Sequence, residues 1–289
     1  MIKTILVPSL GTEADAAAFG AAAAVARAFG AHIDAVHVRL DPVEVAVGMT
    51  PDTSAATMIE GVVDQLERDA QQRQEQAHQA FAQFCARENL AIVAGASAAK
   101  DSASAEWHVE IGREPAWMAR YGVAADLIVA ARGGPEDATA RTILETVLIE
   151  TGRPLLIPVA GVAPAIPPQR VAIAWKATPQ AARAVASALP FLMQARETVL
   201  LSIDEGDAED EDNADRIGRY LAAHGISAAA QRLKPGSEGG AATLLAAARE
   251  RADLLVMGGY GHGRVYEWVF GGFTKLALAE AQLPILIAH

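Results

Sequence analysis

Hydrophobic and polar positions follow two patterns that alternate along the chain. Short apolar runs such as TILVP and LLVMG are bounded by glycine, proline or polar residues, and the longer stretches between them carry apolar residues every three or four positions. The runs are too short for helices and show no strict alternation, so they predict strands buried on both faces of a parallel sheet. The longer stretches predict helices, and the alternation of the two is typical of an α/β fold.

The same pattern occurs twice. Three pairs of segments match in the same order: KTILVPS at 3–9 with RVAIAWK at 170–176, ADLIVAARGG at 125–134 with ADLLVMGGYG at 252–261, and RPLLIPV at 153–159 with LPILIAH at 283–289. Between the repeats, GVAPAIPPQ is too rich in proline and glycine to continue a helix or a central strand. We therefore predict an N-terminal domain over 1–160, a linker over 161–169 and a C-terminal domain over 170–289.

Each repeat predicts five strands and four helices. In the first repeat, strands are expected near 2–8, 32–38, 107–111, 126–131 and 155–159, with helices ending at Phe29, over 55–89, from Pro115 and over 138–151. In the second, strands are expected at 170–175, 198–203, 227–233, 253–257 and 284–288, with helices over 179–194, 210–224, 239–251 and from Gly271. Right-handed crossovers turn this order into an open, doubly wound, mostly parallel sheet in each repeat.

Charge and composition narrow the class of partner. The net charge is −11 and no basic stripe is present, which argues against a nucleic-acid partner. Cys85 is the only cysteine, so an internal disulfide and a cysteine-based metal site are excluded. The N-terminus lacks the features of a signal peptide, and the alanine-rich segment 16–31 is too weakly apolar to span a membrane. We expect a cytoplasmic protein that does not bind membranes.

The most distinctive segment is GGYGHGRVYEWVFGGFT, which starts at Gly258, directly after an apolar run, and leads into a predicted helix. A helix N-terminus in this position favours an anion. A Rossmann fingerprint would follow the first strand, whereas this segment follows the penultimate one. A P-loop would place lysine and then serine or threonine after its second glycine, whereas Arg264 and Val265 stand here. Both of these phosphate loops are therefore excluded.

The remaining spacing is Gly258-x2-Gly261-x9-Gly271-Gly272. It resembles the nucleotide loop of the universal stress protein family, G-x2-G-x9-G-[ST], which follows the fourth strand of a five-stranded α/β domain. The flanking segments ADLLVMG, FTKLALAEAQLPILI and AWKATPQAARAVASALP also look like that family. The resemblance covers nearly the whole chain as a tandem pair, and it implies two Rossmann-like domains.

The resemblance implies an adenine nucleotide, with ATP as the first candidate, bound with or without Mg²⁺ in the C-terminal domain. The residues that it assigns to this site are Met257, Gly258, Gly261, Gly271, Gly272, Thr274, Ile203 and Lys176. Met257 would lie near the ribose and adenine, and the backbone of Ile203 would bond to adenine. The glycines and Thr274 would approach the ribose and the phosphates.

Two of these positions depart from the family pattern. Gly272 replaces serine or threonine, so a hydroxyl that would contact phosphate is missing. Lys176 replaces the aspartate that commonly follows the first strand, and lysine cannot accept a hydrogen bond from a ribose hydroxyl. Lys176 is then a phosphate contact, a residue that closes the site, or a plain surface lysine. Arg264 and His262 at the loop tip face solvent or meet a phosphate.

The first repeat departs further. Its equivalent loop has no second glycine pair at the required distance, and Pro135, Glu136 and Asp137 add bulk and negative charge. Leu10 stands where the family has its aspartate. We predict that this first loop does not bind nucleotide by the family motif.

The other reactive residue types predict no additional site. His32 and His37 are five residues apart on a strand and point to opposite faces, so we expect no metal site there or elsewhere. We expect Cys85 to be an inert thiol. The acidic run 204–215 is expected to start a helix or to form a solvated loop, and Trp175 and Trp268 either pack or line the cleft.

The resulting hypothesis is a regulatory, non-catalytic stress-response protein that binds an adenine nucleotide in its second half. No nucleophile elbow, metal–His–Glu motif or Cys–His pair predicts an enzyme, beyond slow incidental hydrolysis. The family pairs its domains through the last strand, so an internal pseudo-dimer is expected, and chains could pair again as a homodimer. The alternative is an interaction protein of the same fold that binds no nucleotide and acts through an unknown protein partner.

Overall fold

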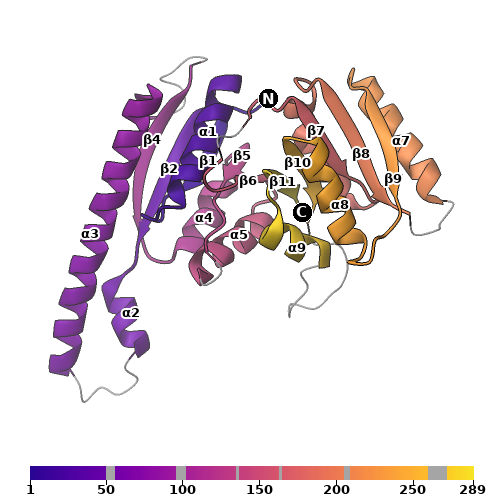
Figure 1. Cartoon of the computed structure of the whole chain (residues 1–289). Coiled ribbons are helices and arrows are strands. Elements are labelled where there is room, and N and C mark those ends of the chain that lie inside the picture. Colours follow the sequence, from indigo (N-terminus) through magenta and orange to yellow (C-terminus); the bar gives the residue numbers. More distant parts are fainter. Residues whose placement is uncertain (50–55, 96–101, 135–136, 163–164, 205–208, 260–271) are drawn as a thin grey trace.

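The computed structural model describes residues 1–49, 56–95, 102–134, 137–162, 165–204, 209–259 and 272–289 (Figure 1). Its strands form one eleven-stranded sheet in the order β3-β4-β2-β1-β5-β6-β11-β10-β7-β8-β9. The strands are β1 (Thr4–Pro8), β2 (His32–Arg39), β3 (Ala91–Ile92), β4 (Ser104–Ile111), β5 (Leu127–Val129), β6 (Leu155–Ile157), β7 (Arg170–Ala174), β8 (Glu197–Ile203), β9 (Ala228–Leu233), β10 (Leu254–Gly258) and β11 (Ile285–Ala288). All neighbours are parallel except β6 and β11.

Helices cover both faces of this sheet. They are α1 (Asp15–Phe29), α2 (Pro42–Met49), α3 (Ala56–Glu88), α4 (Glu114–Gly122), α5 (Ala138–Glu150), α6 (Pro179–Leu192), α7 (Glu209–Ala223), α8 (Gly240–Arg251) and α9 (Gly272–Glu280). Side chains of α1, α3, α6 and α7 form one buried cluster with one face of the sheet, and side chains of α4, α5, α8 and α9 form the other cluster. This is the doubly wound, mostly parallel arrangement that the strand–helix pattern predicts. No helix in the described part of the chain is long and apolar enough to cross a membrane.

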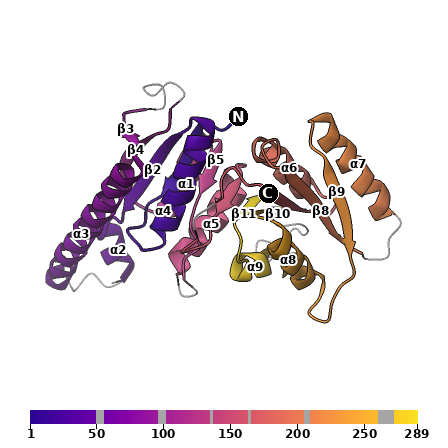
Figure 2. The same cartoon turned by 45° about the horizontal axis from the view of Figure 1, so that its top comes forward.

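The two repeats meet in the middle of the sheet through antiparallel pairing of β6 with β11 (Figures 1 and 2). Leu156 faces Leu286 across this pair, and both side chains are buried. Beside the strands, the rings of Phe29 and Phe191 meet edge to face with centroids 5.4 Å apart. Both hydrophobic clusters contain residues from the two repeats, so the repeats share a core. The internal pairing of the repeats through their last strands is thus present in the fold.

The predicted elements are found within a few residues of their expected bounds, with two additions. Helix α2 was not expected, because Val43, Val45 and Val47 alternate with other residues at a spacing that is not helical. Strand β3 was not expected because it has two exposed residues that pair only with the edge of β4. The first half of the sheet therefore has six strands, although five were predicted.

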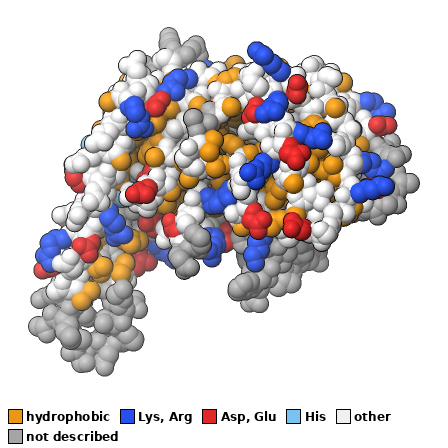
Figure 3. Space-filling model, viewed as in Figure 1, with side chains coloured by type: hydrophobic (Ala, Val, Ile, Leu, Met, Phe, Trp, Pro, Cys, Tyr) orange, Lys and Arg blue, Asp and Glu red, His pale blue; other side chains and the backbone are white. Residues whose placement is uncertain are grey.

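Charges of both signs are interspersed on the face of the molecule in Figure 3. Among the described residues on that face, lysine and arginine side chains lie next to acidic ones and do not gather in a stripe (Figure 3). A nucleic acid would need such a stripe to neutralise its phosphates.

Candidate functional site

The second half of the sheet has a switch point between β7 and β10. Helix α6 follows β7 and covers one face, whereas α9 follows β10 and covers the other face. Met257 of β10 lies beside Ala174 of β7, so the two strands end together. The chain leaves their carboxyl ends in opposite directions, which is where open α/β sheets form a ligand crevice.

The described residues of the predicted site lie at this edge of the sheet. Met257 and Gly258 end β10, Ile203 ends β8, and Lys176 is exposed two residues after β7. Gly272 and the buried Thr274 belong to the first turn of α9. The other predicted residues of the loop, namely Gly261, His262, Arg264, Trp268 and Gly271, lie outside the described residues.

Gly258 packs closely against the start of α6. A Cβ added to this glycine would lie 2.5 Å from the backbone nitrogen of Ala181 and 2.8 Å from the carbonyl carbon of Gln180. These are backbone atoms, which cannot move aside as the end of a flexible side chain can. The strand end and α6 approach one another this closely only because position 258 has no side chain. Glycine at this position is thus explained by packing, whether or not a ligand binds.

The start of α6 is capped by its own side chain. Thr178 is the N-cap residue, and its hydroxyl accepts a hydrogen bond from the Ala181 backbone N–H at 3.2 Å. The preceding Trp175 packs against the cluster beneath α6, and its indole Nε1 is buried with no hydrogen-bond partner among the residues that the structure describes. Trp175 is therefore a packing residue at the edge of the core. Lys176, which follows, is an exposed charged side chain at this edge of the sheet.

Ile203 and the acidic run lie on the next strand along the sheet. The Ile203 side chain packs under the start of α8, where a Cβ on Gly240 would come within 3.0 Å of it. Asp204 forms an ion pair with Arg232 at 2.9 Å. Helix α7 begins at Glu209, so the described end of the acidic run starts a helix, which is one of the two predictions for it.

The first half of the sheet has an equivalent switch point between β1 and β5, and it differs in its chemistry. Asp137 is the N-cap of α5, and its Oδ1 accepts a hydrogen bond from the Ala140 N–H at 2.9 Å. A carboxylate thus occupies the helix N-terminus, the place that a phosphate would need. Gly133 leaves no space beside it, because a Cβ there would lie 2.6 Å from both Asp137 and Ala140.

Side chains also fill the carboxyl ends of β1 and β2. Asp15 is buried, and its carboxylate accepts hydrogen bonds from the Gly11 N–H at 2.8 Å and the Ser9 hydroxyl at 3.2 Å. Burial raises the pKa of Asp15, although these hydrogen bonds oppose the shift. A neighbouring cavity of about 20 Å³, lined by Ser9, His37 and Glu114 among others, is large enough for a water molecule but not for a nucleotide.

His37 and Glu114 both line that small cavity. The His37 Nδ1 lies 2.8 Å from the Ser9 carbonyl oxygen, to which it donates when protonated. Burial lowers the pKa of His37 and raises the pKa of Glu114, so both shifts favour the uncharged forms.

Comparison with known proteins supports this architecture. No protein-family model matches the sequence, and no curated protein matches it. Among solved structures, a universal stress protein from Archaeoglobus fulgidus DSM 4304 is similar over 99% of this chain and 97% of its own, with TM-score 0.68 and 17% identity. The fold is that of the universal stress proteins. A functionally unknown protein from Pseudomonas aeruginosa PAO1 is similar over 99% of this chain and 92% of its own, with TM-score 0.55 and 11% identity.

The predicted resemblance to universal stress proteins is therefore confirmed for the fold, in its tandem form. At these identities the comparison carries over the architecture and no ligand or residue role. The nucleotide residues stay predictions, and the geometry above shows that the described ones share one edge of this universal stress protein fold.

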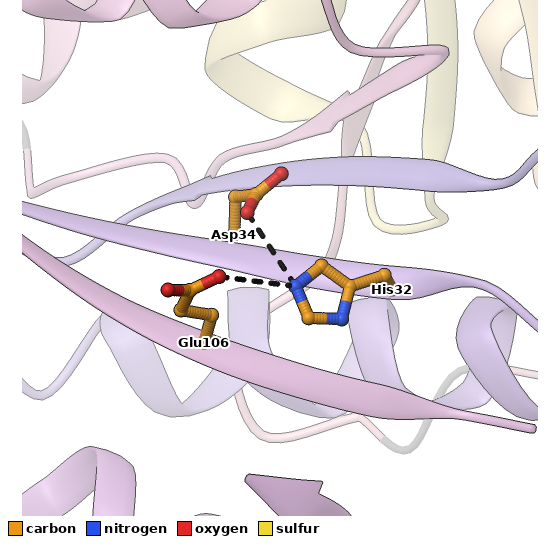
Figure 4. Close-up of side chains that lie close together, drawn as sticks. All are labelled: His32, Asp34 and Glu106. Carbon is orange, nitrogen blue, oxygen red and sulfur yellow. Dashed lines mark ion pairs between the residues drawn. The ribbon is translucent and has the colours of Figure 1, made fainter. Parts of the chain in front are cut away.

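One group of residues in the first half was missed by the sequence reasoning. His32 and Asp34 of β2 and Glu106 of β4 lie close together, with ligand atoms within 4.8 Å of one another (Figure 4). The sequence analysis predicted correctly that His32 and His37 point to opposite faces of β2. It did not consider Asp34, which is two residues after His32 and lies on the same face as His32. The signal was present as HID and EWH, two strand segments in which polar residues alternate.

Proposed function

We propose that this chain is a tandem universal stress protein that binds one adenine nucleotide, ATP, at the switch point between β7 and β10, and that it acts through binding and not through catalysis. The observation that carries this proposal is the position of the glycine loop. Its first glycine, Gly258, ends β10, and Gly272, the residue after its last glycine, begins α9, so both described ends of the segment lie at the edge where open α/β sheets bind ligands.

The start of α9 supports binding of the phosphates. Gly272 is the first residue of this helix, and a Cβ added there would meet no atom of the described residues within 4 Å. Unpaired N–H groups and the helix dipole at such a start attract an anion. The first turn of α5 has Asp137 in this role, and we therefore propose one nucleotide per chain.

Lys176 suggests how this site differs from the family pattern. Its exposed side chain follows β7, where the family commonly has an aspartate that holds the ribose or adenine. A lysine is a donor and a positive charge, so we propose that it contacts the phosphates, alone or beside Mg²⁺. Ribose and adenine would then be held by backbone groups around Ile203 and Met257.

Isothermal titration calorimetry of the full chain with ATP, with and without Mg²⁺, tests the proposal. Gly261→Asp puts a side chain and a negative charge against the phosphates, and we expect it to abolish the binding heat. The matched control is Gly134→Asp in the equivalent loop of the first half, where an added Cβ would meet nothing within 4 Å. We expect this control to bind ATP as the original chain does. Equal loss of binding in both variants would contradict the proposal.

A second candidate is an interaction protein that binds no nucleotide. The observation that favours it is Gly258, because its close contact with α6 explains this glycine without any ligand. This candidate predicts no heat with millimolar ATP for either the original chain or Gly261→Asp. The expected domain limits, the cytoplasmic location and homodimer formation stay predictions under both candidates.

A further inference from the structure

Two neighbouring strands bring four side chains that can bind a metal to one patch of the sheet. In the parallel pairing of β2 with β4, His32 lies beside Ser104, Asp34 beside Glu106, and Val36 beside His108. Alternate residues of a strand point to the same face, so His32, Asp34, Glu106 and His108 share one face. It is the face that α4 covers in part, since Val36, Val38 and Met118 belong to the same buried cluster.

The distances between these side chains fit a small cation. The His32 Nε2 lies 3.6 Å from the Asp34 Oδ1 and 3.8 Å from the Glu106 Oε2. The His108 Nε2 lies 3.1 Å from the same Asp34 oxygen and 3.8 Å from the same Glu106 oxygen. In a tetrahedral site with bonds of about 2.0–2.1 Å, neighbouring ligand atoms are about 3.3–3.4 Å apart. The ligand atoms of His32, Asp34 and Glu106 all lie within 4.8 Å of one another, whereas the His108 ring would have to move toward His32 to join them around one ion.

The second observation is the state of His32 itself. Its side chain is 3% exposed, and its Nε2 is buried with no hydrogen-bond partner in the described part of the molecule. Figure 4 shows this nitrogen pointing between the Asp34 and Glu106 carboxylates. A buried polar atom without a partner is destabilising, which favours a bound group that this nitrogen can contact.

Neighbouring groups hold the ligand side chains in place. The Ser104 hydroxyl lies 2.8 Å from the His32 Nδ1, and Ser104 is fully buried. When Nδ1 carries the proton and donates to Ser104, the Nε2 lone pair is free for a metal, as is usual for ligating histidines. Glu106 Oε2 accepts a hydrogen bond from the Gly95 N–H at 2.5 Å. The ring of His108 packs against Tyr121, with centroids 5.5 Å apart.

The open side of the cluster is accessible to solvent. The Asp34, Glu106 and His108 side chains are each about a quarter exposed, at 29%, 26% and 24%. An ion can thus enter the cluster from water. The cluster starts at His32, the first residue of β2, and therefore lies toward the amino end of this strand. The nucleotide crevice lies beyond the carboxyl ends of strands in the other half, so the two sites are separate.

We propose that His32, Asp34 and Glu106 bind a divalent transition-metal ion, with Zn²⁺ as the best match, and that His108 is its fourth ligand. Two imidazole nitrogens and two carboxylates are a donor set that Zn²⁺ accepts, and the two negative charges balance the ion. Ca²⁺ and Mg²⁺ prefer oxygen ligands throughout, so a site with two histidines selects against them.

The test is a titration of the chelator-treated full chain with Zn²⁺ by calorimetry, together with the visible absorption of the Co²⁺-substituted protein. We expect one Zn²⁺ per chain, no heat with Mg²⁺, and a Co²⁺ spectrum of the intense type that tetrahedral coordination gives. Glu106→Gln and His108→Gln should each weaken Zn²⁺ binding by about tenfold or more. Both side chains are partly exposed, so these variants are expected to fold. Far-UV circular dichroism checks this.

The control variant is His224→Gln, which removes an exposed histidine at the end of α7 in the other half of the molecule. We expect it to leave Zn²⁺ binding unchanged. His32→Gln should abolish binding, and Ser104→Ala should weaken binding without changing the number of ions bound, as expected for a positioning residue. Absence of Zn²⁺ binding would overturn the proposal and leave His32 as an ion-pair partner of the two carboxylates. Binding that survives Glu106→Gln and His108→Gln, or that falls equally in His224→Gln, would overturn it as well.

Discussion

At the scale of single residues, the glycines of one loop have different physical roles. Gly258 is held against the backbone of α6, whereas Gly272 begins α9 with open space around it. In the sequence, both glycines belong to the same loop motif. Only the packing shows that the first would be needed without a ligand. The sequence could not predict this difference, because the contact joins residues 77 positions or more apart in the chain (Gly258 and Ala181).

We expect Gly258→Ala to destabilise the protein by about 1–3 kcal/mol, because the new methyl group would overlap backbone atoms of α6. Urea unfolding of the protein without nucleotide measures this difference. Gly272→Ala is the matched control from the same loop, and its stability should stay within about 0.5 kcal/mol of the original. Equal stability of both variants would show that the contact at Gly258 relaxes without cost.

His37 gives a pH dependence at the same scale. Burial lowers its pKa in the folded protein, so below the unfolded pKa of about 6.5 the unfolded chain binds the proton more readily. This residue therefore makes the protein less stable as the pH falls from about 7 through that value. In His37→Gln the loss of stability between pH 7 and pH 5.5 should be smaller.

Urea unfolding at several pH values measures this change. The exposed His224→Gln variant is the comparison, and its pH dependence should follow that of the original chain. A pH profile of His37→Gln that coincides with the original profile would show that His37 does not titrate differently in the two states.

At the scale of helices and strands, the sequence predicted most of the fold because the segments with a hydrophobic pattern are the ones that are buried in the folded sheet. The short apolar runs became strands buried on both faces, such as β10, whose first four residues are buried. The elements that were missed are those that lack such a pattern: α2 and the two-residue β3. The β2–β4 cluster was also missed, because it needs the register of two strands in addition to the alternation within each.

Helices α5 and α9 are equivalent in the two repeats, but their first residues differ. Asp137 caps α5 through the Ala140 N–H, and we expect Asp137→Ala to destabilise the protein by about 0.5–2 kcal/mol. Glu150→Ala, at the other end of the same helix, removes the same charge from the terminus where an acid is unfavourable. That control should change stability by less than about 0.5 kcal/mol.

Both variants are compared by urea unfolding at pH 7. Loss of stability for Glu150→Ala that equals the loss for Asp137→Ala would indicate a general effect of charge on α5 and not a cap. In that case the account of the first half as a site closed by Asp137 would lose its physical basis.

At the scale of the whole molecule, one chain builds what resembles a pair of domains around a shared central strand pair. β6 and β11 join the halves, and Arg132 of the first half donates a hydrogen bond to the Ala281 carbonyl at the end of α9 at 3.2 Å. The two halves share this arrangement of strands and helices but differ in the residues at their possible binding sites. The second begins α9 with a glycine, and the first begins α5 after the capping Asp137 and has a cluster of histidines and carboxylates.

The central claim is that this molecule holds one adenine nucleotide, in its second half. Native mass spectrometry of the freshly purified chain, with and without added ATP and Mg²⁺, tests it most directly because it counts ligands per chain. We predict one bound ATP for each chain in the original protein and in Gly134→Asp, and none in Gly261→Asp. No retained nucleotide at millimolar ATP, or two nucleotides per chain, would contradict the account.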